Sequence, residues 1–169
     1  NCISNTLCFL KIKDRKFSQE LSIKSETGTN IGISFNYVHS LVNEYLKENM
    51  KTTIEVTLDI NSFLDFFKIK LNKNSITIVN LKRKTTVGHT LTVGKDRNGI
   101  VVILDPQTGE YYQSDKIIEN YLKEFAEFSI YCSSNIKRKF DDLRISSLVH
   151  SYISSNISSL ASDFQNKLI

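Results

Sequence analysis

The stretch GHTLTVGKDRNGIVVILDPQTG, residues 88–109, decides the fold because it predicts a β-hairpin. Its first part is a β-rich run around residues 90–93. Its second part, residues 100–104, is a continuous apolar run, typical of a strand that is buried on both faces. The sequence DRNG at residues 96–99 lies between them, and an Asn-Gly pair between β-rich runs is a strong hairpin signal. We therefore expect two neighbouring antiparallel strands.

Two side chains with useful chemistry stand at the ends of these strands. His89 opens the first strand after Gly88, and Asp105 ends the second strand before Pro106. Because the start of one hairpin strand lies beside the end of the other, we expect the two side chains to be adjacent. An imidazole held by a carboxylate is the arrangement that orients a catalytic base.

A candidate nucleophile stands at the start of the chain. Apolar residues recur at helical spacing within residues 3–12, so a helix is predicted to begin just after Cys2. A helix N-terminus favours the thiolate, which is the reactive form of cysteine. Covalent hydrolysis at a carbonyl requires a nucleophile, a base and a group that orients the base. We therefore predict a triad of Cys2, His89 and Asp105.

Each of these three residues has an ordinary structural explanation when it is taken alone. A cysteine near a chain end is usually an inert packed thiol, and a histidine in a strand is usually a surface or core residue. An aspartate before proline commonly starts a turn. The combination of a helix start with two adjacent strand ends is what favours a catalytic site over three unrelated structural residues.

The remaining pattern predicts an α+β fold with segregated elements. Amphipathic helices are expected around residues 35–46 and 60–71, with Asp59 as the cap of the second, and Ser114 is expected to cap a later helix. Strands are expected near residues 53–58, 75–79, 110–113 and 128–132. The predicted order is helices first, followed by an antiparallel sheet that carries one late helix.

The C-terminal part of the chain has a helical pattern from about residue 136 to residue 169. Its apolar stripe runs from Phe140 to Phe164, and serines occupy much of the opposite face. The stripe must be buried against the rest of the protein or against another protein. We predict a catalytic unit at residues 1–135 and a helical extension of the same domain at residues 136–169.

Composition and charge exclude several function classes. The chain has 169 residues, enough for one domain with a full core, and its net charge of +4 is spread among acidic residues, which argues against nucleic-acid binding. No apolar run is long enough to span a membrane. The 3 cysteines indicate neither a disulfide framework nor a zinc site, and we expect no metal or cofactor. Oligomeric state is left open.

A family resemblance extends this interpretation. The segments Asn1-Cys2 and Gly88-His89, and above all GIVVILDPQTG at residues 99–109, resemble the corresponding motifs of the papain-fold toxins, in the same order over residues 1 to about 133. That family comprises toxin domains and secreted bacterial effectors, and several members are glutamine deamidases of host proteins. The resemblance implies a papain-like fold, a protein substrate and action in a reducing host cytosol.

The resemblance also implies roles for individual residues. Cys2 is the implied nucleophile, His89 the general base and Asp105 its orienting partner, while Gln107 matches the Gln of the same motif with no assigned role. Papain-like enzymes often complete the oxyanion hole with a polar side chain upstream of the cysteine, and Asn1 is the one upstream residue in this sequence. Asn1 and Gln107 are therefore the candidates for the oxyanion hole or cleft, beside the backbone N–H of Cys2. Because the sequence lacks an initiator methionine, we expect a piece of a longer protein.

Three hypotheses remain open from the sequence. The first is a glutamine deamidase acting on proteins, and the second is a cysteine protease with the same triad, because both reactions pass through the same acyl-enzyme. The third is a non-catalytic interaction module whose C-terminal helix binds a partner. The third gains weight if Cys2, His89 and Asp105 lie far apart.

Overall fold

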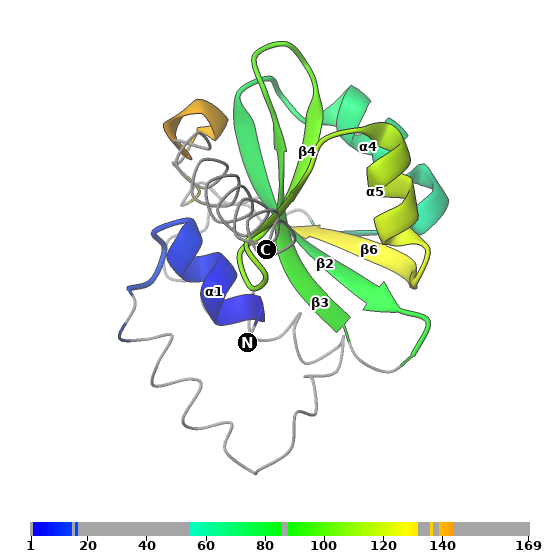
Figure 1. Ribbon diagram of the computed structural model, residues 1–169, viewed down its shortest axis with the longest axis horizontal. Helices are drawn as coiled ribbons and strands as arrows, with labels where there is room; N and C mark the ends of the chain where they lie inside the picture. The colour runs from blue at the N-terminus through cyan, green and yellow to red at the C-terminus, as the bar shows by residue number, and fades with distance from the viewer. Residues whose placement is uncertain are drawn as a thin grey trace, which may run out of the picture.

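The centre of the protein is a six-stranded antiparallel sheet, in the order β1-β6-β2-β3-β4-β5 (Figure 1). The computed structural model describes residues 2–14, 16, 55–85, 88–131, 136 and 139–143. The strands are β1 Glu55–Asp59, β2 Ser75–Arg83, β3 Gly88–Lys95, β4 Val101–Asp105, β5 Glu110–Tyr112 and β6 Phe125–Tyr131. The helices are α1 Cys2–Phe9, α4 Phe63–Lys70 and α5 Asp115–Leu122, with two 3-10 turns, η2 Ile60–Ser62 and η3 Phe140–Leu143. This is an α+β structure, as predicted.

The predicted hairpin at residues 88–109 is present as β3 and β4. Its register pairs Thr92 with Leu104, and every residue of β4 is buried, as the continuous apolar run predicted. In the turn, the Asp96 carboxylate accepts a hydrogen bond from the Ile100 N–H at 2.7 Å. Gly99 takes a φ of 90°, a backbone conformation in which a side chain would be strained. The Asn-Gly signal therefore identified the turn correctly.

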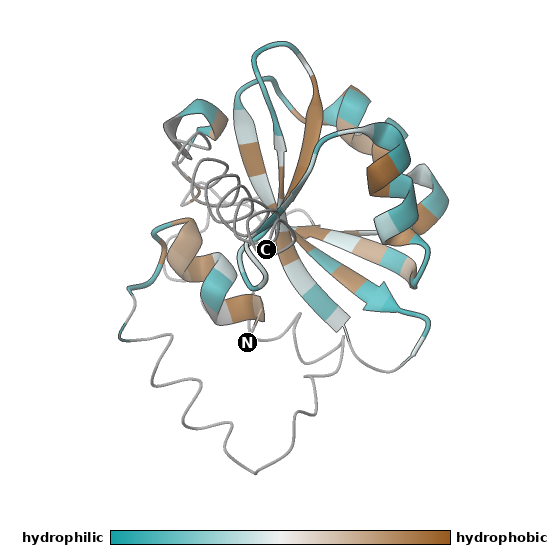
Figure 2. Ribbon diagram, in the orientation of Figure 1, coloured by the Kyte–Doolittle hydropathy of each residue, from teal (hydrophilic) through white to brown (hydrophobic). Residues whose placement is uncertain are grey.

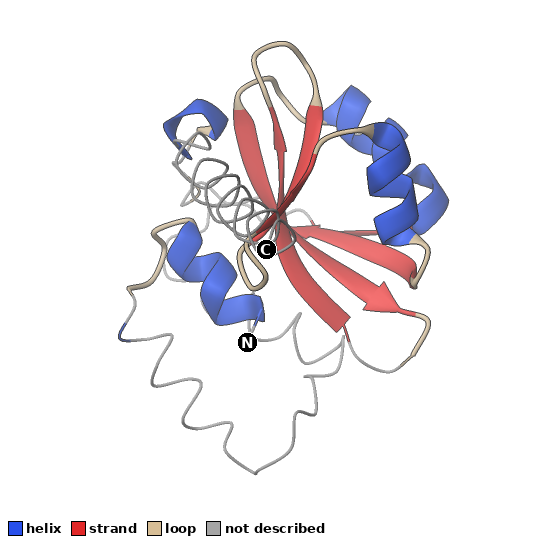
Figure 3. Ribbon diagram, viewed as in Figure 1, coloured by secondary structure: helices blue, strands red, loops and turns tan. Residues whose placement is uncertain are grey.

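The sheet separates two hydrophobic clusters, because successive strand residues point to opposite faces. One face carries even-numbered residues of β2 and β4, such as Ile78 and Leu104, which pack against α1. The other face carries odd-numbered residues, such as Leu81 and Ile103, which pack against α4 and α5. Figure 2 shows the apolar residues running through these strands, and Figure 3 shows helices on both sides of the sheet.

The short turn η3 packs on the same face as α1. Phe140 is buried there, and a Cβ on Gly94 of β3 would collide with its ring, so glycine is required for this close approach. The Asp141 N–H donates to the Asn74 side chain at 2.9 Å, and Asp141 also pairs with Arg97. The first residue of the predicted C-terminal apolar stripe is thus buried against the sheet. Residues 144–169 of the predicted extension lie outside the described residues.

Two features differ from the sequence-based expectation. The order of elements is less segregated than predicted, because the strand expected near residues 53–58 is present as β1 and belongs to the main sheet, beside its antiparallel partner β6. Asp59 does not cap α4: η2 intervenes, and the Asp59 carboxylate accepts instead from the Asn61 side chain at 3.0 Å. The Ser114 cap is confirmed, since its hydroxyl accepts from the Ile117 N–H at 3.2 Å. The helix predicted at residues 35–46 lies outside the described residues.

No helix in the described part of the chain combines the length and the apolar character that a membrane crossing needs.

Candidate active site

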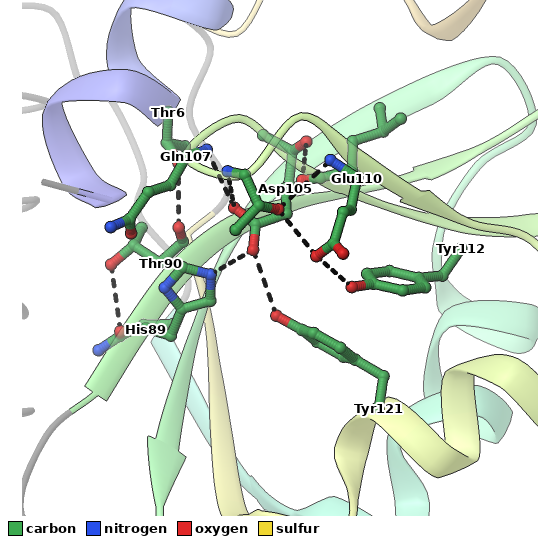
Figure 4. Close-up of polar contacts among 12 residues, drawn as sticks. Thr6, His89, Thr90, Asp105, Gln107, Glu110, Tyr112 and Tyr121 are labelled. Carbon is green, nitrogen blue, oxygen red and sulfur yellow. Dashed lines mark hydrogen bonds and ion pairs between the residues drawn. The ribbon is translucent and has the colours of Figure 1, made fainter. Parts of the chain in front are cut away.

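Helix α1 carries Cys2 to the start of strand β3. Ile3 and Leu7 form the buried face of this helix, and with Leu10, just after its end, they pack against the sheet. One turn after Cys2, the buried Thr6 hydroxyl donates a hydrogen bond to the Thr90 carbonyl at 3.2 Å (Figure 4). This bond joins α1 directly to the strand that carries His89, so the first turn of the helix lies beside the imidazole.

The backbone of β3 is open to the helix at this point. Strand β4 pairs with β3 from Thr92 onward, so it does not cover Thr90. Hydrogen bonding from His89 and from Thr90, together with the His89 charge, lowers the pKa of the Cys2 thiol, so the thiol lies near both residues. Thr90 therefore acts on α1 in two places, because its carbonyl accepts the Thr6 hydrogen bond and its polar groups lower the pKa of Cys2.

His89 and Asp105 form a buried, directly bonded pair. The His89 Nε2 atom lies 2.6 Å from the Asp105 Oδ2 atom, and the two side chains are 8% and 2% exposed (Figure 4). Because Nε2 is engaged by the carboxylate, Nδ1 is the ring nitrogen left to face the Cys2 sulfur. The predicted adjacency of His89 and Asp105 is confirmed. The predicted role of Cys2 beside them stays a prediction, which the effect of His89 on the pKa of Cys2 supports.

The Asp105 carboxylate is held from two sides. Its Oδ1 atom accepts hydrogen bonds from the backbone N–H groups of Gln107 at 3.0 Å and Thr108 at 3.4 Å, in the turn that leads to β5. Its Oδ2 atom accepts from the Tyr121 hydroxyl of α5 at 3.4 Å in addition to contacting His89. Burial and the Asp105 charge raise the pKa of Tyr121 well above its usual range, so Tyr121 remains a neutral donor. The carboxylate is therefore oriented before any substrate binds.

The charges of the three residues support one another. Burial of the Cys2 thiol opposes ionisation, but the hydrogen bond and charge of His89, with Thr90, hold the pKa of Cys2 below its ordinary value. Burial would lower the pKa of His89, but Asp105 and Cys2 outweigh it and raise this pKa to about 9. Burial would likewise raise the pKa of Asp105, yet His89 and the turn N–H groups hold it below its usual range. The site favours a thiolate beside an imidazolium.

The other residues singled out in the sequence are not part of this chain of contacts. Asn1 lies outside the described residues. The Gln107 side chain is exposed, and Gln107 acts on Asp105 through its backbone N–H. Cys8 faces elsewhere, since its thiol donates to the Asp14 carbonyl at 2.9 Å. Within the described ranges, no group of three His, Cys, Asp or Glu residues is placed to hold a metal ion.

Sequence reasoning missed three residues that support the site. Tyr121 of α5 donates to Asp105, Thr90 of β3 lowers the pKa of Cys2, and Thr6 of α1 anchors Thr90. Thr90 follows His89 directly, but a threonine in a strand carries no chemical signal of its own. Tyr121 belongs to the helix predicted after Ser114, and its periodicity indicates packing rather than contact with a carboxylate. No local pattern could have assigned these contacts.

No protein-family model matches the chain. No curated protein is similar enough to count as a relative.

The first prediction concerns the reactivity of Cys2. At pH 6, iodoacetamide should alkylate Cys2 at least about tenfold faster than Cys8, because an ordinary thiol is almost entirely protonated at that pH. Cys8 is a matched internal control, since it lies in the same helix and both thiols are partly buried. Peptide mapping by mass spectrometry measures both rates in one sample. Equal rates in the folded protein would show that Cys2 is not an activated thiolate.

Proposed function

We propose that this protein is a papain-like cysteine hydrolase that deamidates a glutamine side chain of a target protein. The observation that carries the proposal is the buried His89–Asp105 pair beside the start of α1, where His89 lowers the pKa of the Cys2 thiol. A helix start facing a strand of an antiparallel sheet supports a papain-like fold. The motif resemblance supports a secreted bacterial effector or toxin domain that acts in a reducing host cytosol.

The first half of the reaction follows from the charges in the site. The Cys2 thiolate attacks the carboxamide carbon of the substrate, and the negative oxygen of the tetrahedral intermediate is met by the backbone N–H of Cys2 at the start of α1. The His89 imidazolium then donates its proton to the leaving nitrogen. The C–N bond breaks, ammonia leaves, and a thioester on Cys2 remains.

The second half of the reaction uses the same residues with the proton moving in the opposite direction. Neutral His89 takes a proton from a water molecule, which attacks the thioester carbon. The C–S bond breaks, the thiolate re-forms beside the imidazolium, and the product carries a glutamate in place of the glutamine. Throughout, Asp105 keeps the ring in the tautomer and orientation that both halves need.

The substrate class is tested with the whole chain and a eukaryotic cell extract. After incubation, mass spectrometry of the extract proteins should find glutamine converted to glutamate at specific sites, together with released ammonia. Cys2→Ala is the inactive control, and Cys8→Ala is the matched variant that should stay active. New peptide ends that depend on Cys2 would instead show a protease with the same triad. If neither change depends on Cys2, the hydrolase proposal is wrong and an interaction module remains.

A further inference from the structure

A buried polar pair lies on the face of the sheet that α1 covers. Asn80 of β2 and Thr90 of β3 are paired across the two strands, and they are 0% and 1% exposed. The Thr90 hydroxyl donates to the Asn80 Oδ1 atom at 3.2 Å. Polar side chains this deeply buried are costly unless every donor and acceptor is engaged. The pair therefore calls for an explanation beyond packing.

Asn80 leaves one group unused. Its Nδ2 atom is buried and has no hydrogen-bond partner among the described residues. An amide nitrogen carries two donors, and a buried donor without an acceptor costs free energy. Asn80 accepts the Thr90 hydrogen bond through its side-chain oxygen, Oδ1. If the amide group turned by half a rotation, Nδ2 would take the place of Oδ1 and could donate to the Thr90 hydroxyl oxygen.

Thr90 has one hydroxyl proton and two neighbours that can accept it. One is Asn80 Oδ1, and the other is the sulfur of Cys2, which stands one turn before Thr6 on α1, the residue bonded to the Thr90 carbonyl. The Thr90 side chain also lowers the pKa of Cys2. A neutral thiol can donate its own proton to the Thr90 oxygen, which leaves the hydroxyl proton to Asn80. A thiolate has no proton to donate and needs one, so the hydroxyl must turn to the sulfur.

We propose that Asn80 and Thr90 form a hydrogen-bond relay whose direction reverses with the charge of Cys2. Beside the thiol, Thr90 donates to Asn80 Oδ1. Beside the thiolate, Thr90 donates to the sulfur and Asn80 Nδ2 donates to Thr90. Thr90 is in this way a positioning residue that supplies a donor to the nucleophile, and Asn80 completes the chain. The inference rests on the proposed role of Cys2 as the nucleophile.

The relay acts in addition to the charged groups of the site. Among the described residues, His89 of β3 supplies the charge that acts on Cys2, and Asp105 of β4 stands behind His89. The Thr90 carbonyl is already engaged by Thr6 of α1, which holds the threonine in place while its hydroxyl turns. The hydroxyl proton and the Asn80 amide are thus the parts of the relay that move.

The first test measures the pKa of Cys2 from the pH dependence of its alkylation by iodoacetamide. Thr90→Val keeps the shape of the side chain and removes the hydroxyl, so the pKa of Cys2 should rise by about one to two pH units. Thr92→Val is the matched control, because Thr92 lies on the same strand, is fully buried and donates to the Leu104 carbonyl at 3.1 Å. Its Cys2 pKa should equal that of the wild type.

Thr90→Ser keeps the hydroxyl and should restore the wild-type pKa, which keeps the test decisive should Thr90→Val fold poorly. Equal shifts in Thr90→Val and Thr92→Val, or a Thr90→Ser shift as large as that of valine, would overturn the relay. A wild-type Cys2 that reacts no faster than Cys8 would instead overturn the nucleophile proposal itself.

The second test observes Asn80 directly. In ¹⁵N-labelled protein, the NMR signals of the Asn80 side-chain amide should shift with the midpoint of Cys2 ionisation. This inflection should vanish in Cys2→Ala and in Thr90→Val, while any inflection from His89 remains. A merely structural Asn80 would show no inflection at the Cys2 midpoint in the wild type, and that result would overturn its part in the relay.

Discussion

Replacement of Asp105 by asparagine should lower the rate of amide hydrolysis by about four orders of magnitude, the loss that this exchange causes in a Ser-His-Asp triad. The asparagine Oδ1 atom can still accept from the Gln107 and Thr108 N–H groups, so the turn should survive. The atom facing His89 Nε2 becomes an NH₂ donor. Neutral His89 must then carry its proton on Nδ1, toward Cys2, where it cannot act as a base.

The control for this exchange is Asp96→Asn. The Asp96 carboxylate accepts a hydrogen bond from the Ile100 N–H in the β3–β4 turn, much as Asp105 accepts backbone hydrogen bonds in the next turn. The difference is that Asp105 also contacts His89. This variant should keep full activity. Turnover of a verified substrate, with thermal unfolding as a check on folding, measures both variants. Should Asp105→Asn keep full activity, another residue must orient His89, and Gln107 is the next candidate.

Replacement of Cys2 by alanine should abolish turnover, by about six orders of magnitude if its loss resembles that of other triad nucleophiles. The same variant should also acquire a new pH dependence of stability. In the proposed ion pair, between pH 6.5 and about 9, the native state holds a His89 imidazolium beside a Cys2 thiolate, because the pKa of His89 is raised to about 9 and that of Cys2 is lowered. The unfolded chain holds a neutral imidazole and a thiol there. Both states then bind the same number of protons, so this pair contributes little slope.

Removal of the thiol leaves the imidazolium contribution unopposed. The pKa of His89 stays raised by Asp105, though less than in the wild type because Cys2 no longer contributes. The native state of Cys2→Ala therefore binds one more proton than the unfolded state above pH 6.5. The stabilisation that comes from the raised pKa of His89 is fully present below pH 6.5. As pH rises from there through the His89 pKa, the free energy of unfolding of Cys2→Ala falls by up to about 1.4 kcal/mol per pH unit.

Urea unfolding at a series of pH values measures this difference between wild type and Cys2→Ala. Cys8→Ala should follow the wild-type profile, because the Cys8 thiol contacts the Asp14 carbonyl rather than His89. Parallel profiles for wild type and Cys2→Ala would mean that Cys2 remains a neutral thiol in the native protein. That result would contradict the thiolate–imidazolium pair on which the proposed mechanism depends.

Local patterns predicted the parts of the site that depend on neighbouring residues in the chain. The Asn-Gly turn and the apolar run of β4 determine the hairpin, and a hairpin places the start of one strand beside the end of the next. His89 and Asp105 therefore meet wherever that hairpin forms. The helix that begins at Cys2 follows from helical spacing in the same way. The C-terminal extension stays a prediction beyond Phe140.

The tertiary structure alone decided how these parts meet. The bond from Thr6 to Thr90 joins residues 84 positions apart, and Tyr121 reaches Asp105 from the helix on the other face of the sheet. Such contacts depend on which face each helix covers and on where the pairing of β4 with β3 stops, which no periodicity within one segment encodes. By itself, the sequence determined the three candidate groups and the hairpin that joins two of them. Packing of α1 against the open backbone of β3 brought the third, because that contact depends on two layers meeting in space.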